Sequence, residues 1–93
     1  MIKAIIIDDE KNALEMMEWL LQTYCPDVEI KAMCQSGEDG LKAIELHQPD
    51  ILFLDIEMPH FTGIDFINAI DVKPLIIFTT AYSNYAVEGF DFG

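Results

Sequence analysis

Two continuous apolar runs in this chain each end in acidic residues. Residues 51–54 read Ile-Leu-Phe-Leu and lead directly into Asp55, and the isoleucines at 5–7 lead into Asp8 and Asp9. An unbroken apolar run is typical of a parallel strand that is covered on both faces. Open α/β sheets place their chemistry at the carboxyl ends of the strands. We therefore expect a parallel sheet with carboxylates gathered along one edge.

Strand-like and helix-like segments alternate along the whole chain. Strands are expected at 3–7, 28–33, 51–54 and 75–79. Repeated strand–helix units predict a parallel α/β sheet with right-handed crossovers and helices on both faces. The short first unit and the buried third strand favour the flavodoxin-like, doubly wound order 2-1-3-4. We expect one domain over residues 1–93.

Helices are expected between these strands. The first stops before Pro26. Its apolar face is expected to comprise Ala13, Met16, Met17, Leu20, Leu21 and Tyr24. A second helix runs to Leu46 and is capped by Ser36. A third is expected to open at Thr62 and a fourth at Ser83. In the predicted order, strands 3–7 and 51–54 are neighbours. Their carboxyl ends would then bring Asp8, Asp9 and Asp55 to one edge of the sheet.

Composition excludes some classes of function. Five basic residues against seventeen acidic ones give a net charge of −12, which disfavours direct contact with nucleic acid or with an anionic membrane. The apolar stretch near the amino terminus is too short for a signal or spanning segment. A cytoplasmic protein is expected. Cys25 and Cys34 fall at opposite ends of the predicted sheet and are expected to stay reduced.

Three neighbouring carboxylates point to a particular chemistry. Like charges this close are costly without a counter-charge, and Mg²⁺ is the cation that prefers a few carboxylates plus phosphate oxygens. Such a site suits phosphoryl transfer, with Asp55 as nucleophile and Asp8 and Asp9 as metal ligands. Thr79 and Thr80 end the last predicted strand at the same edge, where a hydroxyl can donate to a phosphoryl oxygen.

The ordered pattern of these residues resembles the receiver domain of two-component response regulators. The matching residues are Asp8, Asp9, Asp55, Pro59, Gly63, Thr80 and Ala81. The resemblance implies that Asp55 accepts a phosphoryl group from a histidine kinase. It also implies that Asp9, Asp8 (partly through water), Asp55 and the backbone carbonyl of Glu57 hold Mg²⁺.

The same resemblance assigns further roles. Thr80 matches the hydroxyl that moves toward the phosphoryl group, and Glu57 and Tyr82 match positions that tune self-dephosphorylation. The segment 78–86 resembles receivers that precede LytTR-type DNA-binding domains. We therefore expect a signalling domain rather than a turnover enzyme, with a DNA-binding output domain, involved in transcription regulation, beyond this chain.

One departure from the family is expected to matter. Receivers of this kind continue with a fifth strand, a lysine at its end and a fifth helix, whereas the last lysine here is Lys73, before strand 75–79. We expect a carboxyl-terminally incomplete receiver, and weak phosphorylation of the 93-residue form. A truncated chain is the favoured explanation. A homodimer that exchanges strands through the exposed edge is the alternative.

Two other functions remain open from the sequence. Asp55 is followed two residues later by Glu57, a spacing that loosely resembles the signature of metal-dependent aspartyl phosphatases. Such enzymes need additional segments that do not fit in 93 residues. A non-phosphorylated interaction module is the third class, against which the intact acids argue.

Overall fold

The chain folds into a parallel sheet with helices on both faces. A computed structural model describes residues 1–55, 68 and 74–79. The elements are β1 (Ile2–Ile7), α1 (Lys11–Tyr24), β2 (Val28–Cys34), α2 (Gly37–His47), β3 (Ile51–Leu54) and β4 (Leu75–Phe78). The sheet order is β2-β1-β3-β4, and every pairing is parallel. The predicted fold class and strand order are confirmed. The predicted later helices and everything from residue 80 onward lie outside the described residues.

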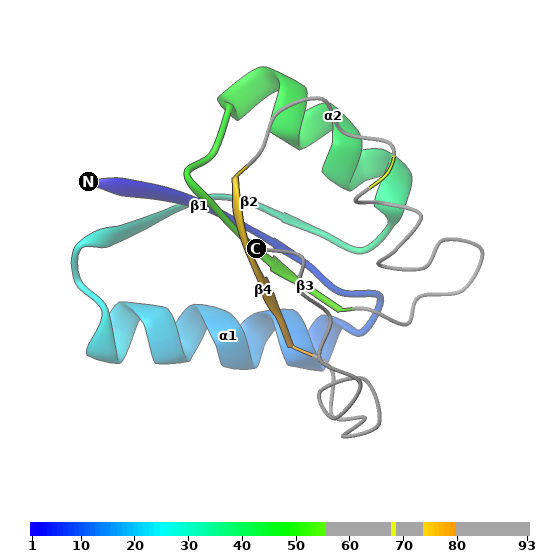
Figure 1. Cartoon of the computed structure of the whole chain (residues 1–93). Coiled ribbons are helices and arrows are strands. Elements are labelled where there is room, and N and C mark those ends of the chain that lie inside the picture. Colours follow the sequence, from blue (N-terminus) through cyan, green and yellow to red (C-terminus); the bar gives the residue numbers. More distant parts are fainter. Residues whose placement is uncertain (56–67, 69–73, 80–93) are drawn as a thin grey trace, which may run out of the picture.

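The sheet separates two hydrophobic cores. In Figure 1 α1 and α2 lie on opposite sides of the sheet. The core on the α2 side contains Ile5, Ile7, Cys34, Ile44, Leu52 and Leu54. The core on the α1 side contains Ala4, Ile6, Leu14, Leu21 and Phe53. Alternate residues of β1 and β3 thus enter different cores, which explains why both sequences are apolar throughout. Each fully buried Ile or Leu side chain contributes roughly 1.5–3 kcal/mol to folding.

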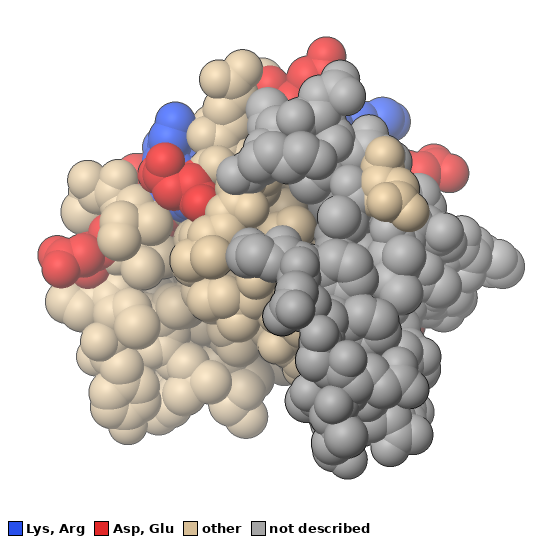
Figure 2. Space-filling view, in the orientation of Figure 1, with Lys and Arg blue, Asp and Glu red and all other residues tan. Residues whose placement is uncertain are grey.

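The buried face of α1 agrees with the predicted one only in part: Leu21 and Met17 pack in the core as expected. Leu14 and Leu21 are the buried residues of this helix. Met16, Leu20 and Tyr24 are exposed to 59%, 36% and 69%. The helix carries apolar residues on two adjacent stripes, and only the stripe centred on Leu14 and Leu21 faces the sheet. Much of the surface visible over α1 is accordingly uncharged (Figure 2).

The edge strand β2 contains an irregularity that its sequence does not reveal. Ala4 of β1 pairs with Ile30, but the next residue, Ile5, pairs with Ala32, so the register skips Lys31. Ile30 therefore packs in the α1-side core and Ala32 in the α2-side core. The predicted alternation of partly buried and exposed residues is confirmed along the strand. The partly buried residues lie on the α1 side up to Ile30 and on the α2 side from Ala32, so the expectation of a single wetter face is not met. An extra residue of this kind is a β-bulge, which turns the following side chains to the other face.

Local signals place α2 where the sequence predicts it. The Ser36 hydroxyl accepts a hydrogen bond from the Asp39 backbone N–H at 3.1 Å, so the predicted amino-terminal cap is confirmed. The helix ends at His47 and is capped by Gln48, whose φ of 47° lies in the left-handed region. The Lys3 ammonium donates to the His47 carbonyl at 3.3 Å, which satisfies one of the last carbonyls of the helix.

The amino-terminal ends of the strands are held together by one acid. The Asp50 carboxylate accepts from the Lys3 backbone N–H at 2.9 Å. The Asp50 backbone N–H donates to the Lys3 carbonyl at 2.8 Å, and its carbonyl accepts from Leu75 N–H at 3.0 Å. Asp50 therefore ties the starts of β1, β3 and β4 together.

Two smaller predictions can be compared with the structure. Cys25 is exposed, Cys34 is buried, and both are free thiols. In the part of the chain that is described, no helix has both the length and the apolar character needed to cross a bilayer.

Candidate metal centre

The backbone at the carboxyl ends of the strands is fixed by the sheet itself. The ladder continues one residue past each strand: Asp8 N–H donates to the Cys34 carbonyl at 3.0 Å, and Asp55 N–H donates to the Ile7 carbonyl at 3.0 Å. Both acids therefore start from backbone positions that adjacent strands hold in register. A site built on such positions is more rigid than one carried by a free loop.

The three predicted acids lie together at this edge. One carboxylate oxygen from each of Asp8, Asp9 and Asp55 lies within 4.8 Å of the other two. Asp8 is buried, with 7% of its surface exposed, and the other two are half-buried. The sequence prediction that these residues converge is confirmed.

Burial perturbs the carboxyl of Asp8. Desolvation raises the pKa of its carboxyl above the ordinary value of 3.8, and the nearby charges of Asp9 and Glu10 raise it further. The Glu10 backbone N–H, which donates to Asp8 Oδ1 at 2.9 Å, opposes this shift. The site thus concentrates negative charge where solvent cannot fully stabilise it.

This donor set fits a hard divalent cation. Carboxylate oxygens are the ligands that Mg²⁺ prefers, and Mg²⁺ commonly uses one or two of them together with water and phosphate oxygens. A cation here would neutralise the mutual repulsion of the acids and favour the charged form of Asp8. Asp8, Asp9 and Asp55 are the described residues that could hold it.

Other predicted site residues are not described. Glu57, Thr80 and Tyr82 fall in the segments 56–67 and 80–93, so their roles stay predictions. Thr79 is described: it is half-buried at the end of β4, and its N–H donates to the Leu54 carbonyl at 3.0 Å. The fourth strand therefore ends at the same edge as the acids.

One neighbour of the site was missed by the sequence analysis. The Gln35 side-chain amide donates to the Asp9 carbonyl at 3.4 Å and so connects the end of β2 to the acidic loop. The available signal was positional, because Gln35 follows the second strand and that strand also ends at this edge. A single glutamine in a loop gives no chemical signal by itself.

Comparison with known proteins identifies the class. The family described as the response regulator receiver domain matches residues 4–93. The chain belongs to this family, whose members are the receiver domains of two-component systems.

Relatives at the level of sequence are regulatory proteins. The transcriptional regulatory protein BtsR of Escherichia coli strain K12 is 39% identical over 93 residues, which cover 98% of this chain and 38% of BtsR. An uncharacterized response regulatory protein of Vibrio cholerae, VC_A0850, is 41% identical over 91 residues, which cover 95% of this chain and 35% of that protein. The chain thus spans little more than a third of the length of these relatives.

Solved structures show the same architecture. The response regulatory domain of protein mrkE from Klebsiella pneumoniae superposes with a TM-score of 0.81 at 35% identity, covering 97% of this chain and 75% of that one. The amino-terminal domain of an uncharacterized protein, WS1339, from Wolinella succinogenes gives a TM-score of 0.80 at 28% identity, covering 100% of this chain and 77% of that one. The fold and the family therefore agree.

Proposed function

We propose that this domain is a phosphorylation-controlled switch in which Asp55 accepts a phosphoryl group from a histidine kinase. The observation that carries the proposal is the meeting of Asp8, Asp9 and Asp55 within 4.8 Å at the carboxyl ends of β1 and β3. Membership of the receiver domain family supports the same function.

The transfer is a substitution at phosphorus. An Asp55 carboxylate oxygen forms the new P–O bond while the P–N bond of the donor's phosphohistidine breaks, and the imidazole nitrogen leaves with the electron pair. Asp55 follows the central strand β3, and its N–H is held by the Ile7 carbonyl, so the nucleophile is supported by a rigid backbone. The transferred group remains on the protein, which makes the reaction a signalling event.

Mg²⁺ is the cofactor that we propose for this transfer. Asp8, Asp9 and Asp55 would hold it, together with the Glu57 backbone carbonyl; when bound, it supplies positive charge next to the phosphoryl oxygens. Asp9 lies on the loop between β1 and α1, whose position Gln35 supports through the Asp9 carbonyl. Asp8 keeps its orientation through the Glu10 N–H.

The remaining roles follow from the family. Thr80 would donate its hydroxyl to the phosphoryl group and so report phosphorylation, and Glu57 and Tyr82 would set the rate of self-dephosphorylation. The kinase and a carboxyl-terminal output domain are the proposed partners. We propose that the phosphoryl transfer takes place in the cytoplasm. Since relatives include proteins named as transcriptional regulators, the output is proposed to be DNA-binding, of the LytTR type.

Intact-mass spectrometry tests the proposal directly. The chain is incubated with acetyl phosphate and Mg²⁺, and we expect a fraction of molecules to gain the mass of one phosphoryl group. Asp55→Asn should abolish the gain, whereas Asp50→Asn, which removes the same charge at the opposite edge of the sheet, should retain it. An equal gain in Asp55→Asn, or none in the unmodified chain, would contradict the proposal. Turnover of p-nitrophenyl phosphate would instead favour an aspartyl phosphatase.

A further inference from the structure

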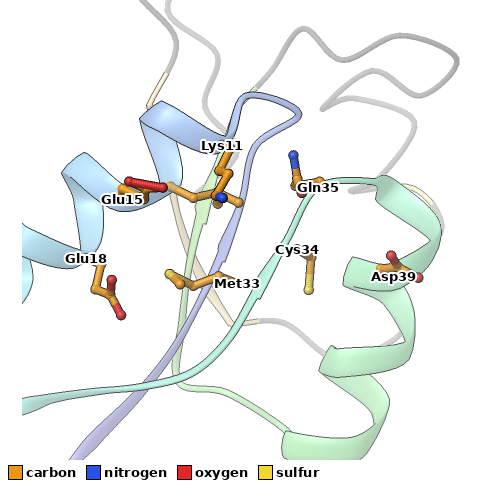
Figure 3. A pocket seen from close by; sticks show the side chains of 8 residues that line it. Lys11, Glu15, Glu18, Met33, Cys34, Gln35 and Asp39 are labelled. Atoms are coloured by element: carbon orange, nitrogen blue, oxygen red, sulfur yellow. The ribbon is translucent and has the colours of Figure 1, made fainter.

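A groove runs along the outer edge of the sheet beside the carboxyl half of β2. It has a volume of about 760 Å³. It is lined by Lys11, Leu14, Glu15, Glu18, Met33, Cys34, Gln35 and Asp39. Figure 3 shows that these residues come from α1 on one side, from the end of β2 in the middle and from the start of α2 on the other. The edge of the strand therefore lies between two walls, each contributed by a helix.

The strand at the base of this groove can pair with another segment. Among the described residues β2 pairs with β1 alone, so its second edge faces away from the sheet. Such an edge presents backbone N–H and C=O groups that a further strand can bind. The bulge at Lys31 and the ion pair of Lys31 with Glu29, at 3.0 Å, protect the amino-terminal half against long pairings. Only the short stretch from Ala32 onward is left for pairing.

The groove combines an apolar base with acidic walls. Met33 is 41% exposed at the base. Glu15 and Glu18 belong to the α1 wall and Asp39 to the α2 wall, against one cation, Lys11, among the lining residues. A second copy of this chain would bring the same acidic walls and a net charge of −12 to the contact, which electrostatic repulsion disfavours. The complementary partner is therefore basic.

We propose that this groove binds a basic peptide segment in extended conformation, which adds as a further strand beside the carboxyl half of β2. Main-chain hydrogen bonds to the strand edge supply affinity. Side chains of the added strand alternate between its two faces, so basic ones on one face approach Glu15 and Glu18, and those on the other approach Asp39. Asp8, Asp9 and Asp55 do not line the groove, although Gln35, which does, also donates to the Asp9 carbonyl, and binding does not require phosphorylation.

Amide chemical-shift titration of the isotope-labelled chain tests this proposal. The probe is a capped peptide of alternating lysine and valine, for which we expect saturable shifts at residues 32–35. A peptide that repeats lysine–proline–proline, with the same number of lysines, keeps the charge, but only its lysines carry an N–H and its prolines favour the polyproline II conformation over a paired strand. It should bind far more weakly, as should a glutamate–valine peptide.

A pair of charge reversals provides the matched control. Glu15→Lys, at an exposed groove position, should weaken binding of the lysine–valine peptide by about threefold. Glu45→Lys makes the same charge change at an exposed position of α2 that does not line the groove, and it should leave binding nearly unchanged. Equal weakening by both variants, equal binding of the proline peptide, or shifts confined to other surfaces would overturn the proposal.

Discussion

Acidic residues have opposite effects at the two ends of the parallel strands, the amino-terminal edge and the carboxyl-terminal edge of the sheet. At the amino-terminal edge, the exposed Asp50 carboxylate accepts a hydrogen bond from the Lys3 N–H at 2.9 Å. At the carboxyl-terminal edge, Asp8 is buried beside Asp9 and Asp55, and its pKa is raised mainly by desolvation. The first arrangement stabilises the fold. The second arrangement lowers the stability of the metal-free fold, because it holds a buried carboxylate beside two other acids.

This difference separates an acid that connects strand ends from the acids to which we assign a function. Asp50 makes contacts that are all local to the strand ends that it connects, and its carboxylate remains in solvent. The carboxyl edge retains three close carboxylates despite their repulsion, as functional sites often do at some cost in stability. Paired substitutions at the two edges can test the contrast.

The largest expected effect is on metal affinity. Asp9→Asn should weaken Mg²⁺ binding at least about tenfold, because a carboxylate ligand is replaced by a neutral amide. Asp50→Asn removes the same formal charge at the other edge and should change the affinity little. Isothermal titration calorimetry with Mg²⁺ measures both. Equal losses would mean that net charge, rather than the acid cluster, governs binding.

An intermediate effect is expected on stability at the amino edge. Asp50→Ala should lower the free energy of unfolding by about 1 kcal/mol, since the Lys3 N–H loses its side-chain acceptor. Asp50→Asn keeps an acceptor oxygen in place and should lose less. Urea denaturation with fluorescence of Trp19 follows both variants. If the two variants lose the same stability, the carboxylate charge matters more than the hydrogen bond.

The smallest effect, opposite in sign, is expected at Asp8. Because the pKa of Asp8 is raised in the fold, its charged form destabilises the metal-free protein, and Asp8→Asn should raise the free energy of unfolding at neutral pH by up to about 1 kcal/mol. Below the ordinary pKa of 3.8 the wild-type carboxyl is protonated in both states, so the gain should disappear. The gain in the free energy of unfolding should grow as pH rises from 3.8 through the raised pKa of Asp8, because the wild-type carboxyl then becomes charged in the fold. Thermal unfolding with a chelator present, over a pH series, checks the sign; a loss at neutral pH would contradict it.

The sheet and the meeting of the acids were predictable because both follow from local pattern. Apolar runs that end in acid specify buried strands and the edge at which the acids lie, and alternation of strands with helices specifies parallel pairing. The cap of α2 was also predictable, since the hydrogen bond from Asp39 to Ser36 joins residues three positions apart.

Features that depend on contacts between distant segments were not predictable. The apolar spacing of α1 is compatible with two stripes, and packing against β1 and β2 selects Leu14 and Leu21 while leaving Met16 exposed. The skip at Lys31 arises only when β2 pairs with β1. Asp50 looks like an ordinary loop acid until three strand starts meet around it.

The sequence alone determined the order of the strands and the edge that carries the carboxylates, because periodicity and chain direction are properties of local segments. The tertiary structure decided how deeply Asp8 is buried, which stripe of α1 faces the sheet and where the edge of β2 opens into a groove. These features depend on desolvation and packing, which exist only once segments distant in sequence have come together.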